Sequence, residues 1–372
     1  MSRIVLFFIF LIVYIYLSKM EIDNRRKVRL FIIMVSIPLI LESALRNLGV
    51  GQDTYQYYQL FEDTKGLSFN YLIHALLYVG GKDYFYYLTQ KAFQTVFPRF
   101  HIWLGFIALL YFFSLGLYLY KNKLSLIQCL VAYTFYLQFF YGFFSCTGIR
   151  QTLAVSFVML AYLALNDKKY YLYALLTLLG ILFHASAIAS LIVLLAKRLR
   201  QIGFIVFLIP FTLPFIFMYG GQISRWFILD TMLSERFSAY TNVATGTGSV
   251  YITIVYIVVF IGMYIYYNDL VKENVYGFNV KIYTICIFLL PLLYVSNTAH
   301  RVALYFSMSM FVLIPVIVKK IRFQGRYVIT ILIIMTLTYI TVRKARPYYF
   351  YWQEMEMVDI NGIPMVLVEP LY

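Results

Sequence analysis

The sequence is short of charge and of cysteine. Charged residues make up 13% of the 372 positions, against roughly 25% in a soluble domain. The three cysteines, at positions 129, 146 and 286, show neither metal-site spacing nor a disulfide framework. No small-residue cleavage site follows the apolar stretch 4–17, so we expect a first membrane span there and not a cleaved signal. These features exclude a soluble enzyme and a disulfide-stapled scaffold, and we expect neither a metal nor a cofactor.

Apolar residues make up 62% of the chain, in many runs that reach the roughly 17–25 residues needed to cross a bilayer. The runs are continuous and do not alternate as barrel strands do. We therefore predict an all-α, polytopic membrane protein with about 12 transmembrane or re-entrant helices. The predicted spans are 4–17, 30–45, 100–120, 124–144, two arms of a hairpin within 148–186, a short pass to 196, 202–219, 250–267, one ending near 296, 302–318 and 327–342.

The net charge of +15 is concentrated in short loops. Six loops predicted to face the cytoplasm carry 18 of the 31 Lys and Arg residues: 19–29, 121–123, 167–169, 197–201, 268–281 and 319–326. This distribution satisfies the positive-inside rule and leaves no basic domain for nucleic acid. We predict a membrane domain over 1–342, with a substrate cavity on the outer face, and an extracytoplasmic tail over 343–372.

The outer segment 46–99 is predicted to be a glycine-containing loop followed by short interfacial helices over 70–79 and 83–97. Asp83 is the expected cap of the second of these helices. In the tail, Asn361-Gly362 indicates a β-hairpin.

The stretch 148–186 predicts a helical hairpin whose turn, Asp167-Lys168-Lys169, faces the cytoplasm and whose ends return Arg150 and His184 to the outer face. One 27-residue helix over 170–196 would invert every later loop. Two short passes keep the basic loops inside, so we expect a broken or partly re-entrant pair with its break near His184.

Ionisable residues within spans are functional candidates, and several converge on the predicted outer face. Guanidinium groups bind phosphate bidentately, and a histidine can accept a proton from an attacking hydroxyl. Each also has a plain interpretation, because helix-end arginines extend to the interface and Asp-Thr after Gly suits a turn. The candidates are Arg46, Asp53, Arg150, His184, Arg236, His300 and Arg301.

Five motifs carry all of these residues except Arg46, in order: V-G-Q-D-T-Y-Q-Y-Y (50–58), G-I-R-Q-T-L-A (148–154), L-F-H-A-S-A (182–187), R-F-S-A-Y (236–240) and H-R-V-A-L-Y-F (300–306). Together they resemble the EpsG family of Wzy-type polysaccharide polymerases, over roughly residues 30–320. Many members have G-T-D-T-Y where this chain has Gln52 as its second residue.

The resemblance implies an enzyme of exopolysaccharide, capsule or O-antigen assembly in the bacterial cytoplasmic membrane. Such an enzyme joins repeat units carried on undecaprenyl diphosphate at the outer face, alongside a flippase and a chain-length regulator. It implies His184 as the general base, with Asp53 as orienter or substitute. The implied donor-binding residues are Arg150, Arg301, Arg46, Arg236, Gln151 and Tyr55.

Two other classes of function stay open, a transporter and another membrane transferase. A flippase or exporter of lipid-linked oligosaccharide would place charges at both faces and contain pseudo-repeats, whereas this chain has a one-sided cluster and no repeat. An O-antigen ligase shares the chemistry and differs in its acceptor. An O-acetyltransferase with an inner-face acyl donor would need a histidine near the cytoplasm, where none is predicted.

Overall fold

The computed structural model describes residues 2–79, 84–199, 203–211, 218–219, 248–290, 297–342, 348–358 and 364–367. These residues are predominantly helical, as predicted. They form two compact units, here called the first unit (1–163, 171–185 and 323–372) and the second unit (164–170 and 186–322).

Long helices make up most of the first unit. They are α1 (Ser2–Lys19), α2 (Asn24–Ala44), α6 (Phe100–Lys121), α7 (Leu126–Phe139), α8 (Ile149–Asn166), α9 (Tyr170–Phe183) and α18 (Arg326–Val342). Asp23 caps α2 by accepting hydrogen bonds from two backbone N–H groups of its first turn. Between α1, α2 and α7, the buried Tyr133 ring contacts Phe10 and Phe31, and its hydroxyl lies 3.1 Å from Ser36 Oγ.

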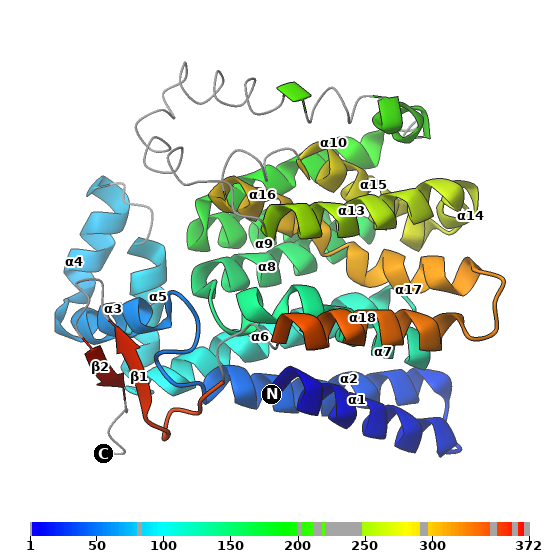
Figure 1. Ribbon diagram of the computed structural model, residues 1–372. Helices are drawn as coiled ribbons and strands as arrows, with labels where there is room; N and C mark the ends of the chain where they lie inside the picture. The colour runs from blue at the N-terminus through cyan, green and yellow to red at the C-terminus, as the bar shows by residue number, and fades with distance from the viewer. Residues whose placement is uncertain are drawn as a thin grey trace. The chain divides into compact units, whose positions relative to one another are not determined.

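Three short helices lie at one end of these long helices (Figure 1). They are α3 (Thr54–Gly66), α4 (Phe69–His74), which continues as a π-helical turn over Ala75–Val79, and α5 (Tyr84–Gln94). The two helices predicted over 70–79 and 83–97 are therefore present, although Asp83 lies outside the described residues. α3 was not predicted. Its aromatic residues bury Phe61 against Phe100 of α6, which explains why the chain becomes helical immediately after the glycine-containing loop.

One small two-stranded sheet accompanies the helices of the predicted all-α fold. Strands β1 (Met355–Val358) and β2 (Pro364–Leu367) pair antiparallel, with Met355 opposite Leu367 and Val358 opposite Pro364. This pairing confirms the hairpin predicted around Asn361-Gly362, whose turn lies outside the described residues.

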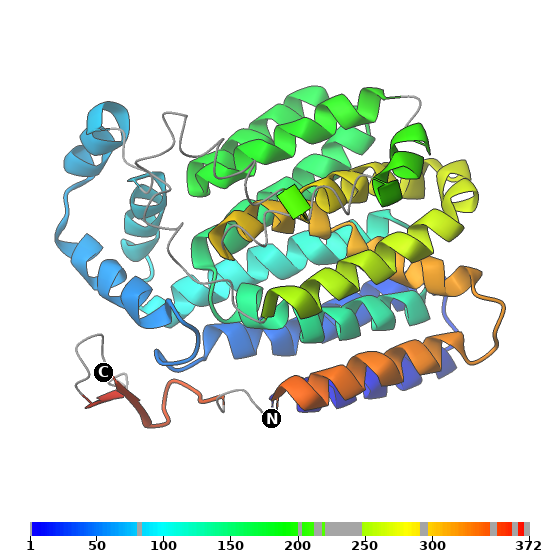
Figure 2. The same cartoon turned by 45° about the horizontal axis from the view of Figure 1, so that its top comes forward.

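The second unit contains α10 (Ile192–Arg198), α13 (Gly248–Ile265), α14 (Tyr267–Lys272), α15 (Asn274–Phe288), α16 (Asn297–Ser307) and α17 (Met310–Lys320). Figure 2 shows α13, α15 and α17 from a second direction, in the yellow-green to orange part of the colour range. Tyr283 of α15 donates to the Tyr256 carbonyl of α13 at 2.6 Å. The Cys286 thiol contacts the Ala303 carbonyl of α16 at 3.5 Å.

The helices of membrane length are fewer than the predicted spans. Among the described residues, α6 and α8 are long and apolar enough to cross a bilayer. A third span is formed if Arg301–Ser307 and Met310–Lys320 are one helix bent by 48°. The chain predicted to be continuous over 302–318 is thus broken, and a count of 12 spans stays a prediction.

The break near His184 is confirmed. α9 ends at Phe183, a 3₁₀ segment covers Ala185–Leu191, and α10 begins at Ile192. A single helix over 170–196 is therefore wrong.

Candidate functional site

The first two sequence motifs meet in the first unit. Gly51 has a φ of +95°, and a Cβ atom there would lie 1.9 Å from the Cys146 carbonyl oxygen. Only glycine permits this backbone geometry together with so close an approach. Thr54 Oγ1 lies 3.0 Å from the same carbonyl and 2.7 Å from that of Val50. The loop 50–54 is therefore fixed against the segment that leads into α8.

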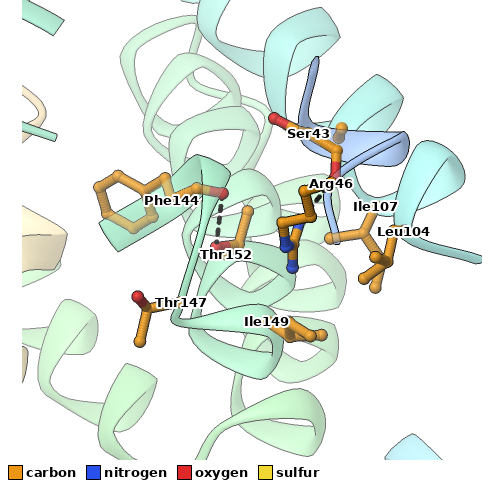
Figure 3. A pocket seen from close by; sticks show the side chains of 9 residues that line it. Ser43, Arg46, Leu104, Ile107, Phe144, Thr147, Ile149 and Thr152 are labelled. Carbon is orange, nitrogen blue, oxygen red and sulfur yellow. Dashed lines mark hydrogen bonds between the residues drawn. The ribbon is translucent and has the colours of Figure 1, made fainter. Parts of the chain in front are cut away.

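Arg46 contacts this junction through Thr54 and is 97% buried. Figure 3 shows its side chain among those that line a small pocket. One terminal nitrogen donates to the Ser43 carbonyl at 2.6 Å and to the Ser145 carbonyl at 3.0 Å, and Nε donates to Thr54 Oγ1 at 3.3 Å. The remaining space is a cavity of about 10 Å³, which is room for about one water. Three donors bound to protein acceptors favour a structural role for Arg46 over its predicted contact with a diphosphate.

The charge of Arg46 is not neutralised by the neighbouring thiol. Burial raises the pKa of Cys146 to about 11, so Cys146 is a neutral thiol at physiological pH. Burial also lowers the pKa of Arg46, but a guanidinium stays protonated in proteins. Hydrogen bonds to carbonyl dipoles therefore stabilise this buried cation.

Arg150 occupies the first turn of α8 and is only half-buried. Its Nε donates to the Tyr57 hydroxyl at 2.8 Å, and its guanidinium carbon lies 5.6 Å from the centre of the Tyr57 ring. Tyr57 in turn packs edge-on against Tyr86 of α5, whose hydroxyl accepts from Trp103 Nε1 of α6 at 3.0 Å. Burial raises the pKa of Tyr86, so this acceptor is neutral. Arg150 is held by an aromatic chain that spans three helices.

Asp53 immediately precedes α3 and is half-buried. Its carbonyl accepts from the Tyr57 backbone N–H at 3.0 Å, which places Asp53 one helical turn before the tyrosine that holds Arg150. Its side chain forms no capping hydrogen bond, contrary to the turn-forming interpretation. The predicted residue Tyr55 is half-buried beside Tyr58, and Gln151 is buried next to Arg150.

His184 follows the last residue of α9 and is half-buried; its backbone N–H donates to the Gly180 carbonyl at 3.0 Å. The preceding ring, Phe183, stacks on Phe157 of α8 at 5.5 Å and meets Phe85 of α5 edge-on at 5.0 Å. Phe157 lies seven residues beyond Arg150, or about 10 Å along the helix. α5 thus packs against both parts of the site: Phe85 contacts Phe183, the residue before His184, and Tyr86 contacts Tyr57.

In the second unit, Arg301 is half-buried in α16, four residues before Tyr305. The Tyr305 hydroxyl lies 3.1 Å from Ser186 Oγ, so the fifth motif contacts the third. Arg236, with its whole motif, lies outside the described residues.

Sequence reasoning missed the part played by the C-terminal segment. The backbone N–H of Asn47 donates to the Tyr349 carbonyl and that of Tyr351 to the Leu45 carbonyl, each at 2.9 Å. The Tyr348 hydroxyl donates to the carbonyl of the buried Glu42. A short antiparallel pairing, with Arg46 opposite Phe350, therefore fixes both sides of Arg46. The aromatic composition of residues 348–352 is the signal that could have indicated this packing.

No three His, Cys, Asp or Glu side chains gather as possible metal ligands within the part of the chain that the structure describes.

Residues 29–354 match the EpsG family. The chain belongs to the EpsG family. The matched range contains all five motifs and extends to the segment 348–353 that pairs beside Arg46. No curated protein and no solved structure matches the chain. Membership of the EpsG family, together with the apolar helices, indicates a membrane protein of polysaccharide biosynthesis.

Proposed function

We propose that this EpsG-family protein polymerises oligosaccharide repeat units carried on undecaprenyl diphosphate. The enzyme transfers the growing glycan onto the next unit and releases undecaprenyl diphosphate at the outer face of the bacterial cytoplasmic membrane. About 12 transmembrane or re-entrant segments carry it, with the six basic loops inside. A flippase supplies the units, and a chain-length regulator acts on the product.

The arrangement of Arg150 is the observation that supports this proposal most. A guanidinium in the first turn of a helix combines two features that favour a diphosphate, a forked donor and the positive end of the helix dipole. Because Arg150 is half-buried and held through Nε, its fork is oriented before substrate arrives. Pre-oriented donors of this kind stabilise the charge that develops on a leaving group.

The reaction needs a base as well as an anion site. In the proposed step, the acceptor hydroxyl oxygen bonds to the anomeric carbon of the donor glycan while the bond to the diphosphate breaks. The hydroxyl proton passes to His184, and Asp53 orients this histidine or replaces it as the base. Arg150 and Arg301 hold the diphosphate, with Gln151 and Tyr55 in contact with the substrate. The reaction uses no metal.

The decisive experiment is a polymer assay in membranes. Purified undecaprenyl-diphosphate repeat unit is incubated with the wild type and with His184→Ala, and products are separated by size. His74→Ala is the matched control, since His74 is exposed on α4. A ladder from the wild type and the control, and none from His184→Ala, supports the proposal.

Two other outcomes change the assignment. A ladder from both variants keeps the enzyme and moves the base to Asp53. No ladder from folded wild-type protein with its cognate substrate overturns the polymerase and leaves a flippase, an exporter or a ligase.

A further inference from the structure

A groove between α2 and α6 lies outside the candidate site. It encloses about 460 Å³, within the range of roughly 300–1,000 Å³ typical of ligand pockets. Both helices line it with apolar side chains over most of its length, including Ile33, Ile37, Leu109 and Phe113, each at least half exposed. The groove is therefore open along its side, where a bilayer would meet a membrane protein.

The floor of the groove is formed at Gly116. A Cβ atom at this position would lie 2.5 Å from Ile32 Cγ2, so a larger residue would push α2 and α6 apart. The groove follows α2 from Arg29 to Ile40, eleven residues or about 16 Å. Its shape suits one extended hydrocarbon chain.

Cationic groups occupy one end of the groove. Arg29 donates to the Tyr120 hydroxyl at 3.4 Å, and its guanidinium carbon lies 5.6 Å from the centre of that ring. Arg25 donates to the Tyr120 carbonyl at 3.2 Å. The nearby acid, Asp23, accepts from backbone N–H groups of α2. This end therefore presents net positive charge, whereas the remainder of the groove is apolar.

We propose that the α2–α6 groove binds an anionic glycerophospholipid of the bilayer. An acyl chain lies along the groove, and the headgroup phosphate meets Arg29 and Arg25, because basic sites between membrane helices select anionic headgroups. This second lipid site is distinct from the proposed donor site. Arg29 lies 15 residues before Ala44, the last residue of α2, which is about 22 Å along the helix. The inference does not rest on the proposed polymerase activity, and a negative polymer assay leaves it unchanged.

Lipid titration of the full chain tests this site. The protein is purified in detergent, titrated with phosphatidylglycerol, phosphatidylcholine or undecaprenyl phosphate, and bound lipids are counted by native mass spectrometry. We expect one phosphatidylglycerol to be retained in preference to the other two lipids. Arg29→Gln should weaken this binding about five-fold, since one basic residue near a membrane surface contributes about 1 kcal/mol.

Two matched pairs of variants distinguish lipid binding in the groove from general attraction of lipid to surface charge. Arg26→Gln removes the same charge at an exposed position that does not line the groove, and should leave binding within two-fold. Ile37→Trp should obstruct the groove and weaken binding, whereas Met34→Trp on the same helix should not.

Three results would overturn the inference: equal retention of phosphatidylglycerol and phosphatidylcholine, an equal loss in Arg26→Gln and Arg29→Gln, or preferential retention of undecaprenyl phosphate.

Discussion

Arg46 and Arg150 belong to the same set of predicted anion-binding residues, but the structure surrounds them differently. Arg46 is buried, with three donors bound to Ser43, Ser145 and Thr54. Arg150 is half-buried, and the Tyr57 hydroxyl orients it through Nε. Two arginines that look equivalent in the sequence thus have different surroundings, one within the protein framework and one at a partly open helix end.

The comparison shows what burial does to a cation. A buried guanidinium must find acceptors within the protein, because an unpaired buried charge is very costly. The guanidinium N–H groups that donate to those acceptors are then engaged within the protein and do not reach a ligand. A partly exposed guanidinium such as that of Arg150 bears a smaller desolvation cost, because water still reaches part of it. Substitution at the two positions should therefore give different defects.

Of these substitutions, Arg150→Ala should give the largest effect, and that effect should be on polymerase activity and not on stability. Loss of one pre-oriented donor at a developing negative charge typically lowers a rate about 10²–10³-fold. Polymer formation in the membrane assay should fall by that factor, while the amount of folded protein stays unchanged. Arg99→Ala, at an exposed arginine just before α6, is the control. Normal chain length in Arg150→Ala would refute its assignment.

Arg46→Met should act mainly on stability. The substitution leaves the Ser43 and Ser145 carbonyls and the Thr54 hydroxyl without this donor, which should lower the free energy of unfolding by about 3 kcal/mol. Thermal unfolding in detergent measures the change. An unaltered melting temperature together with lost polymer would restore the original prediction that Arg46 binds substrate.

Gly51→Ala should weaken the junction that holds both arginines. The added methyl group would collide with the Cys146 carbonyl, and alanine disfavours the positive φ, so we expect a loss of about 2 kcal/mol in stability. Gly66→Ala is the control, because no atom lies within 4 Å of a Cβ placed there. Equal melting temperatures for the two variants would show that the loop is free to move.

The sequence predicted much of this architecture because hydrophobic runs and helix breakers act locally. The helical nature of the chain and the short helices predicted over 70–79 and 83–97 follow from such local patterns, whereas the break near His184 was predicted from the charge of the later loops. The 48° bend between Ser307 and Met310 was missed, since neither glycine nor proline marks this break.

The different surroundings of the two arginines could not be predicted, because burial depends on contacts between distant segments. Arg46 meets Ser145, 99 residues away, and its neighbour Asn47 pairs with Tyr349. No local pattern encodes such distances. The motifs singled out the candidate residues but could not show which arginine the backbone would enclose. The His184→Ala assay tests the predicted role of His184, and the roles of Arg301 and Arg236 stay predictions.

Of these substitutions, Tyr57→Phe should have the smallest effect. It tests most directly how the surroundings of Arg150 differ from those of Arg46. It removes the hydroxyl that accepts from Arg150 at 2.8 Å but keeps the ring that packs on Tyr86. Loss of one such hydrogen bond is worth about 1 kcal/mol, so polymer formation should fall about five-fold. The melting temperature should stay unchanged because Arg150, being half-buried, can exchange this acceptor for water. Tyr71→Phe, at an exposed tyrosine of α4, is the control. A lower melting temperature with full activity would contradict this account and give Arg150 the structural role argued for Arg46.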